Sequence, residues 1–296
     1  MNNDELAKII KEVAAEILSE NNGTKVAAQN VQNFTSKTSV VSDGEVPDLS
    51  LVDYRARVDV PNAANMREYL DIRSKTDARL GVWRAGPRLC TNTYLRFRAD
   101  HATAMDAVFQ DVPSEYLQKL GLKEYSTKCK SKDDFLTRPD LGREFDDETL
   151  AQIKADCGTN MQVQVYVSDG LSSSSVVANV EDILPAIMQG LKMHNISAGK
   201  PFYVKYGRVG AEDVIAQTLN AEVTVVLLGE RPGLASGESM SAYMVYKGYP
   251  GIAEAKRTVV SNIHKKGTNP VEAGAAIAEL CVKMLKEKAS GLDLTR

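Results

Sequence analysis

This chain of 296 residues has little of what builds metal and redox sites. Its four cysteines are scattered, and no two of them form a Cys-x-x-Cys pair, so neither a structural zinc site nor a disulfide framework is expected. The three histidines are also far apart, without the His-x-His or His-x-x-x-His spacing that brings two imidazoles onto one metal ion. We therefore expect reduced thiols and no metal ion held by protein side chains.

Long apolar runs and a large excess of charge are missing as well. No run approaches the roughly 18 residues that a membrane-spanning helix needs, and charges interrupt the N-terminus where a secretion signal would be apolar. The formal net charge is −3, which does not favour nucleic acid or an anionic membrane as the main partner. The composition, 43% hydrophobic and 25% charged, is that of a globular protein, and we expect a cytoplasmic one.

Motifs for nucleotide binding and for serine catalysis are also absent. There is no Gly-x-x-x-x-Gly-Lys-Ser/Thr run, and no Gly-x-Gly-x-x-Gly run follows an expected strand. The stretch VSDGLSSSS places four serines after Gly170, but it does not form the Gly-x-Ser-x-Gly turn of a hydrolase. A serine hydrolase acting through Ser172 or Ser174 is one alternative. It would need a histidine as the base, and no histidine of the sequence has a spacing that indicates this role. The simpler interpretation is a turn at Gly170 whose serines cap the next helix.

The N-terminus predicts a helix on a tether. Residues 1–20 carry an apolar stripe at helical spacing, and residues 21–46 are rich in Asn, Ser, Thr and Gln, which is typical of a flexible linker. Such a helix docks either onto its own domain or a neighbouring subunit, or it is a detachable address that binds a groove on another protein. The stripe consists of Leu6, Ile9, Ile10, Val13, Ala14, Ile17 and Leu18.

The rest of the chain predicts a mostly helical region, residues 47–160, and an α/β domain, residues 161–296. In the second region the β-rich runs QVQVYV and PFYVKYG are each followed by a helical pattern, at 176–193 and 211–219, and AEVTVVLLGE then begins a third strand. This alternation is typical of a doubly wound, mostly parallel sheet. Further strands are expected in MSAYMVYKG and RTVVSNI, and a last helix at 271–288.

Loops that follow parallel strands meet at the carboxyl edge of a sheet, where α/β proteins bind ligands. Four loops are expected to converge there: residues 168–175, 207–210, 229–237 and 261–269. Glu230, in LLGERPG, is placed to accept hydrogen bonds from hydroxyl or amide groups of a ligand, and a surface ion pair with Arg231 is the simpler alternative. The residues alone thus indicate a ligand-binding α/β module without a complete catalytic set.

Several long runs resemble the small (light) subunit of ethanolamine ammonia-lyase. The resemblance extends from about Leu80 to Arg296 with its spacings intact, while the residues before it match loosely. The runs that carry it are GPRLCTNTYLRFRADHATAMDAVFQDV, FLTRPDLGREF, VQVYVSDGLSSSSVVANVEDILPAI, YGRVG, LLGERPGLASGESMSAY, RTVVSNIHKKGTNPVEAGAAIAEL and KASGLDLTR.

This resemblance implies an adenosylcobalamin-dependent lyase that converts ethanolamine to acetaldehyde and ammonia by a radical mechanism. It implies a Rossmann-like small subunit, inactive alone, that clamps the cobalamin against a large catalytic subunit. The positions that match the family's cobalamin contacts are Val209, Glu230 and Val259. The third position is a cysteine in some relatives, and a valine there offers its backbone or an apolar surface. No residue of this chain is expected to be catalytic.

The resemblance also bears on the cobalt ligand and on localisation. Cobalamin proteins that replace the cofactor's own base carry Asp-x-His-x-x-Gly, which this sequence lacks, so the cobalt of the cofactor is expected to keep its dimethylbenzimidazole (base-on). In organisms that use ethanolamine the enzyme is commonly packaged in a bacterial microcompartment, which makes residues 1–20 a candidate targeting helix for a shell protein. The alternative is a stand-alone α/β ligand-binding or scaffolding module.

Overall fold

Residues 48–295 are the part of the chain that the computed structural model describes. The expected helix at residues 1–20 and the expected linker at residues 21–46 lie outside these residues. Contacts between Cα atoms separate residues 48–296 from residues 1–47 as a unit of their own. The predicted division of this unit at residue 160 stays a prediction.

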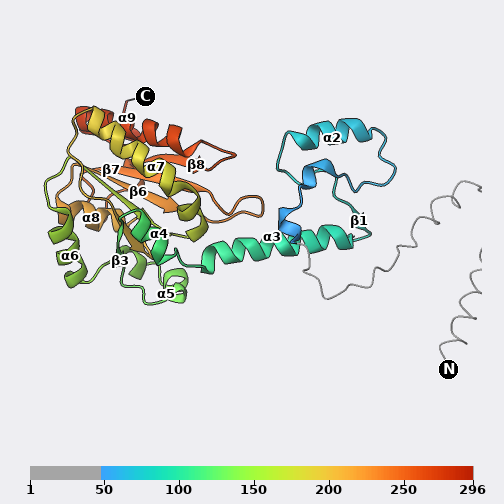
Figure 1. Cartoon of the computed structure of the whole chain (residues 1–296), viewed down its shortest axis with the longest axis horizontal. Coiled ribbons are helices and arrows are strands. Elements are labelled where there is room, and N and C mark those ends of the chain that lie inside the picture. Colours follow the sequence, from blue (N-terminus) through green and yellow to red (C-terminus); the bar gives the residue numbers. More distant parts are fainter. Residues whose placement is uncertain (1–47, 296) are drawn as a thin grey trace, which may run out of the picture. The chain divides into compact units, whose positions relative to one another are not determined.

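Among the described residues, six strands form one mixed sheet (Figure 1). Its first four strands are mutually parallel, and the last two are antiparallel to their neighbours. The predicted mixed α/β fold with a mostly parallel sheet is therefore confirmed. In spatial order the strands are β3 (Lys123–Ser126), β5 (Phe202–Lys205), β4 (Val163–Ser168), β6 (Val223–Gly229), β7 (Met240–Tyr246) and β8 (Thr258–Ile263).

Helices cover both faces of this sheet (Figure 1). One face packs against α7 (Ser173–Met193) and α9 (Pro270–Glu287), and the other packs against α8 (Ala211–Leu219) and α6 (Asp147–Cys157). The crossovers from β4 to β5 and from β5 to β6 pass through α7 and α8, as the alternation of the sequence predicted. All three expected helices of this region are confirmed to within a few residues.

Burial explains why these sequences form these elements. Every residue of β4 and β6 is buried, because both strands are central and have helices on both faces. Ser172 caps α7 by accepting a hydrogen bond from the backbone N–H of Ser175, and Asn269 caps α9 ahead of Pro270 at its first turn. Helix α8 ends at Asn220, whose left-handed backbone terminates it.

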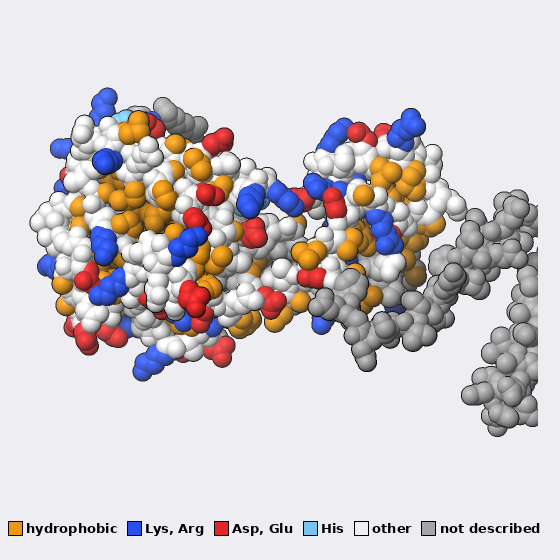
Figure 2. All heavy atoms as spheres, in the orientation of Figure 1, with side chains coloured by type: hydrophobic (Ala, Val, Ile, Leu, Met, Phe, Trp, Pro, Cys, Tyr) orange, Lys and Arg blue, Asp and Glu red, His pale blue; other side chains and the backbone are white. Residues whose placement is uncertain are grey.

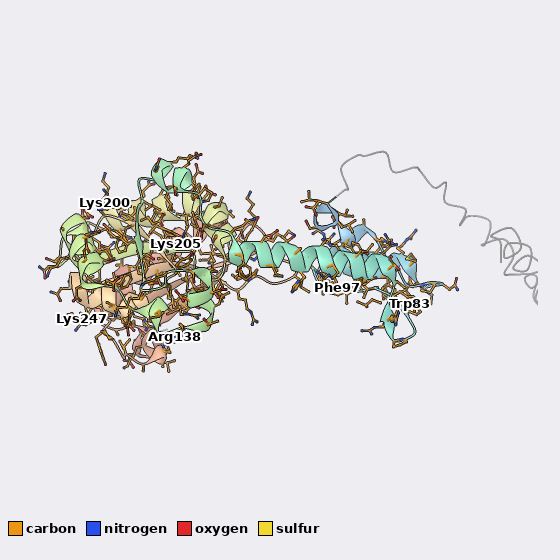
Figure 3. The ribbon with its side chains drawn as sticks, turned by 90° about the horizontal axis from the view of Figure 1, so that it is seen from below. Trp83, Phe97, Arg138, Lys200, Lys205 and Lys247 are labelled. Carbon is orange, nitrogen blue, oxygen red and sulfur yellow. The ribbon has the colours of Figure 1, made fainter. Side chains whose placement is uncertain are left out.

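The region before β4 contains several helices, and it also adds the short edge strand β3, which the sequence did not predict. Arg96 lies on the long helix α3 (Thr91–Phe109), on which Figure 3 labels Phe97, and it donates hydrogen bonds to the carbonyl oxygens of Leu49 and Ser50. The guanidinium of Arg79 lies 4.4 Å from the centre of the Phe97 ring. The elements are η2 (Leu49–Leu51), η3 (Tyr54–Ala56), α2 (Met66–Ser74), β1 (Arg84–Ala85), β2 (Arg88–Leu89), α3 (Thr91–Phe109), α4 (Ser114–Lys119), α5 (Lys132–Thr137) and η4 (Leu141–Arg143), and two short helices, η5 (Glu254–Lys256) and η6 (Gly291–Asp293), follow later in the chain.

None of the helices in residues 48–295 is long and apolar enough to cross a membrane.

Candidate functional site

The four loops that were predicted to converge do lie at one edge of the sheet. Ser168 at the end of β4 pairs with Leu228, and Gly229 at the end of β6 pairs with Met240, which in turn pairs with Ile263 at the end of β8. The loop after β5 joins them, because the Gly207 N–H donates a 3.1 Å hydrogen bond to Ser168 Oγ.

The serine-rich loop is packed onto backbone groups. Ser172 and Ser174 both donate hydrogen bonds to the carbonyl oxygen of Gly237, over 2.5 Å and 3.0 Å, and Ser173 donates to that of Gln110. Ser172 is fully buried and also accepts the capping hydrogen bond from the N–H of Ser175. Ser172 therefore caps α7, as the capping interpretation predicts, and Ser172, Ser173 and Ser174 also hold two distant segments against the start of this helix.

The serine nucleophile of the alternative interpretation is not supported by this geometry. His194 pairs with Glu279 and His264 pairs with Asn262, whereas His101 is exposed on α3, and none of the three has a hydrogen bond to the serine loop in the described residues. Residues 48–295 also contain no group of three or more His, Cys, Asp or Glu side chains that could hold a metal ion. Catalysis by a serine–histidine pair thus has no structural basis in this part of the chain.

Gly170 makes the loops after β4 and β6 meet backbone to backbone. Its φ is +51°, in the left-handed region, and a Cβ atom there would lie 2.5 Å from the carbonyl oxygen of Gly229. A Cβ on Gly229 would in turn lie 2.2 Å from the carbonyl oxygen of Asp169. Only glycine fits at both positions, so this part of the carboxyl edge is filled by protein and does not form an open crevice.

The predicted residues Glu230 and Val259 are joined through a third residue, Tyr243. The Tyr243 hydroxyl donates a 2.8 Å hydrogen bond to Oε1 of Glu230, the first residue after β6. On the neighbouring strand Val259 pairs directly with Tyr243 in the antiparallel register, which puts both side chains on the same face of the sheet. This is the face that α8 covers, since Tyr243 packs against the hydrophobic cluster that includes Ile215 of α8.

Val209 reaches the same face from the loop between β5 and α8. It is partly buried and packs against the same hydrophobic cluster as Tyr243. Its carbonyl oxygen accepts a 3.0 Å hydrogen bond from the Glu212 N–H in the first turn of α8. The structure therefore brings all three predicted residues, from segments 21 or more residues apart, to one face of the sheet, where Tyr243 contacts Glu230 and Val259.

Other charged residues of the converging loops point elsewhere. Arg208 donates a hydrogen bond to the carbonyl oxygen of Phe135 and lies 4.5 Å above the Phe135 ring, so it is engaged by α5. Asp169 is fully buried, and its Oδ1 accepts a 2.7 Å hydrogen bond from the Tyr206 N–H while Lys132 lies 3.4 Å from Oδ2. Burial raises the pKa of Asp169 above its usual range, and the Lys132 charge opposes that rise. These side chains therefore stabilise the loops at the carboxyl edge of the sheet.

Tyr243 is the residue that the sequence analysis missed. Burial raises its pKa, and the hydrogen bond to Glu230 raises it further, so Tyr243 remains a protonated donor. The signal was present in MSAYMVYKG, where Met240, Ala242 and Met244 alternate onto the α9 side and leave Tyr243 on the other. A partly buried tyrosine on that face can pack with its ring while its hydroxyl forms a hydrogen bond.

This surface combines an apolar contact area with a hydrogen-bond acceptor. Val259 is 46% exposed, which leaves an apolar surface available for contact. Glu230 is partly exposed, and no hydrogen bond engages its Oε2 in the described residues, so that oxygen is available to accept one from an amide. By contrast, the cavity of about 390 Å³ lined by Arg73, Arg79 and the loop 233–237 includes none of the three predicted residues.

Comparisons with known proteins identify the family. The family model described as "Ethanolamine ammonia-lyase light chain (EutC)" matches residues 66–295. The ethanolamine ammonia-lyase small subunit of Clostridium tetani is 52% identical over 290 residues, covering 98% of each chain. That of Fusobacterium nucleatum is 51% identical over 291 residues (98% of this chain, 96% of the relative), and that of Listeria monocytogenes is 48% identical over 294 residues (99% and 100%). This chain belongs to the ethanolamine ammonia-lyase light chain family.

Proposed function

We propose that the chain is the small subunit of an adenosylcobalamin-dependent ethanolamine ammonia-lyase, which converts ethanolamine to acetaldehyde and ammonia. In this proposal it closes over the cobalamin with Val209, Glu230 and Val259 and presses it against a large catalytic subunit. The family match favours this function over a stand-alone binding or scaffolding module. The parallel core β5-β4-β6, with crossover helices on both faces, supports the finer assignment as Rossmann-like.

The single observation that carries the proposal is the joining of Glu230 and Val259 through Tyr243. A carboxylate, a phenol and an exposed valine on one face of a sheet offer hydrogen-bond acceptance beside an apolar surface. Small-molecule sites combine these features, with a few polar groups that fix orientation against an apolar lining. The arrangement is an open surface of this chain, which suits a ligand held between two subunits.

In this proposal the residues of the chain bind and orient the cofactor, and none of them transfers a proton to or from the substrate. When bound, adenosylcobalamin would supply the radical chemistry. Tyr243 holds one carboxylate oxygen of Glu230, and the other oxygen would accept a hydrogen bond from an amide of the cofactor. Val209 and Val259 would contact apolar parts of the cofactor and exclude water. We propose that the cofactor would be held with its own base on cobalt (base-on), and the support is that the sequence lacks Asp-x-His-x-x-Gly.

Exposed apolar side chains support a protein partner of the kind a large subunit would be. Helix α3 leaves Tyr94, Leu95, Met105 and Phe109 each at least 45% exposed. Figure 2 shows hydrophobic side chains at the surface of the part that carries α2 and α3. Apolar surface of this extent marks interaction sites in soluble proteins.

The proposal is tested by reconstitution. The purified full-length chain is mixed with the large subunit, adenosylcobalamin and ethanolamine, and acetaldehyde is measured. We expect product only when both chains and the cofactor are present. Equal acetaldehyde formation by the large subunit alone would contradict a required role for this chain, and no product from the complete mixture would contradict the assigned reaction.

We also propose that residues 1–20 direct the enzyme to a shell protein of an ethanolamine-utilising microcompartment. The support is the apolar stripe at helical spacing in that segment, followed by a polar stretch at 21–46. Residues 1–20 fused to a fluorescent protein should form puncta in a cell that assembles such compartments, and the same fusion should be diffuse after the compartment genes are removed. A diffuse signal in compartment-forming cells would refute the targeting role.

A further inference from the structure

A buried charged cluster lies on the α8 side of the sheet, next to the candidate cofactor surface. Its centre is Arg257, whose side chain is 2% exposed. Arg257 Nη1 donates hydrogen bonds to Glu212 Oε2 (2.8 Å) and Asp213 Oδ1 (2.9 Å), and Nη2 donates to Asp213 Oδ2 (2.7 Å). Nε donates to Glu254 Oε2 over 2.9 Å, and the Glu254 side chain is 77% exposed. One guanidinium thus engages three carboxyl groups in a fixed planar geometry.

The cluster connects the two valines proposed to contact the cofactor. Glu212 and Asp213 form the first turn of α8, and the Glu212 N–H binds the carbonyl oxygen of Val209. Arg257 immediately precedes β8 and lies two residues before Val259. The Arg257 side chain therefore joins the backbone that carries Val209 to the backbone that carries Val259, although β5 and β8 are separated by three strands in the sheet.

Stability alone is a poor explanation for this cluster. A buried ion pair loses solvation on both charges, and well-packed apolar residues of similar volume often stabilise a fold at least as well. The cluster is also incompletely satisfied, because Glu212 Oε1 and the nearby buried hydroxyl of Tyr166 have no hydrogen-bond partner among the described residues. What a bidentate guanidinium provides beyond an apolar contact is a defined distance and angle between two backbone segments.

We propose that Arg257 is a positioning residue for the cofactor surface: by binding Glu212 and Asp213 it sets the first turn of α8, and with it Val209, at a fixed place relative to Val259. This inference rests on the proposed function, since it assumes that the two valines contact cobalamin. It assigns a role to residues that do not touch the cofactor themselves. If Val209 shifted relative to Val259, cobalamin would bind more weakly, because the cofactor has to contact both valines at the same time.

The test compares substitutions at two adjacent basic residues, Arg257 and Lys256, in the full-length chain assembled with the large subunit. Arg257→Lys keeps the positive charge but replaces the planar fork with a single ammonium, and Arg257→Met removes the charge. Lys256→Met is the matched control, because Lys256 is 47% exposed and, within residues 48–295, its ion pair is with Asp293 at the surface. Asp213→Asn breaks the same link from the α8 side while keeping side-chain shape. For each complex we measure the dissociation constant for hydroxocobalamin by equilibrium binding and the melting temperature. Activity assays give the KM for adenosylcobalamin and kcat separately.

We expect Arg257→Lys and Asp213→Asn to raise the dissociation constant roughly tenfold, the equivalent of one lost charge-assisted hydrogen bond. The KM for adenosylcobalamin should rise in parallel while kcat at saturating cofactor stays within about twofold of wild type. Lys256→Met should bind like wild type. A role in folding alone predicts a lower melting temperature with an unchanged dissociation constant in the two Arg257 variants and Asp213→Asn, and that result would overturn the inference.

The same experiment separates this inference from the proposed function. If the wild-type complex binds no cobalamin, the proposed function fails. If the wild-type complex binds cobalamin and the Arg257 and Asp213 variants bind it equally well, only the positioning role fails. Should Arg257→Met fail to assemble, the Arg257→Lys and Asp213→Asn variants decide the question, because both keep the size of the buried side chain close to the original.

Discussion

The phenolic hydroxyl of Tyr243 donates a 2.8 Å hydrogen bond to Oε1 of Glu230, which joins the middle of β7 to the first residue after β6. Tyr243 also faces Val259 across the β7–β8 pair. The candidate cofactor surface therefore depends on the antiparallel extension of the sheet, and it lies on the α8 face beside the carboxyl edge. A hydrogen bond to a charged acceptor of this kind contributes about 1.5–3 kcal/mol when it is partly buried.

Removing that hydroxyl should weaken cofactor binding without unfolding the chain. In Tyr243→Phe the ring still packs, but Glu230 loses the donor that orients it, and we expect cobalamin affinity of the assembled enzyme to fall about three- to tenfold. Equilibrium binding of hydroxocobalamin measures this. The matched control is Tyr246→Phe, since Tyr246 lies on the same strand but packs on the α9 side. Equal affinities for both variants would contradict the role given to Tyr243.

Ser172 should matter for stability and not for chemistry. Ser172→Ala removes the helix cap of α7 and the hydrogen bond to the carbonyl oxygen of Gly237. We expect the free energy of unfolding to fall by about 1–2 kcal/mol, as for other lost N-caps, while the activity of the correctly assembled enzyme is retained. Urea unfolding and acetaldehyde assays check the two parts. Loss of activity with intact assembly and cobalamin binding would reopen the serine as a catalyst.

The contact between the loops after β4 and β6 predicts a strong dependence on Gly170. Gly170→Ala combines a left-handed backbone with a Cβ atom 2.5 Å from the Gly229 carbonyl oxygen, and we expect a loss of about 3–5 kcal/mol. Gly121→Ala is the control, because Gly121 has a similar φ of +66° but nothing within 4 Å of the added atom. Its cost should be only about 1–2 kcal/mol. Similar unfolding free energies for the two variants would show that the loops do not touch.

The buried carboxyl of Glu212 should make stability depend on pH. Burial raises its pKa well above the usual 4.5, the Arg257 charge opposes the rise, and Asp213 adds to it. The native state thus holds a proton that the unfolded state releases, so this contribution is fully present below pH 4.5 and is lost as the pH rises through the native pKa. The unfolding free energy of wild type minus that of Glu212→Gln should therefore decrease as the pH rises from 4.5 toward neutrality. Urea titrations across that range measure it, and a constant difference would contradict the prediction.

Periodicity in the sequence predicted most of the sheet and its helices. The strands β4, β5 and β6 are apolar runs of the length that buried parallel strands require, and the helices that follow have clear stripes and caps. The edge strand β3 was missed because KEYS is short and its exposed Lys123 and Glu124 give no apolar period. A four-residue edge strand is held by pairing with β5, which the sequence alone does not reveal.

The candidate site was predictable only in part. Glu230 could be placed at a strand end from the run LLGERPG, and the family resemblance indicated Val209 and Val259. That Tyr243 joins Glu230 to Val259 depends on the register between β7 and β8, which contains an irregularity near Met240. The link from Arg257 to Glu212 spans 45 residues of sequence and depends on where α8 lies over the sheet. A local sequence pattern determines neither the link through Tyr243 nor the link from Arg257 to Glu212, so both links became visible only in the structure.

The most direct test of the account is the cobalamin affinity of the assembled enzyme with Glu230 altered. Glu230→Gln keeps the size of the side chain and its link to Tyr243 but replaces the free carboxylate oxygen, whereas Glu230→Ala removes both oxygens. Equilibrium binding of hydroxocobalamin to complexes with the large subunit, with circular dichroism as the control for folding, should give affinity in the order wild type, Glu230→Gln, Glu230→Ala, with at least about a tenfold loss for the last. Unchanged affinity in a folded, assembled Glu230→Ala complex would contradict the proposal that this surface holds the cofactor.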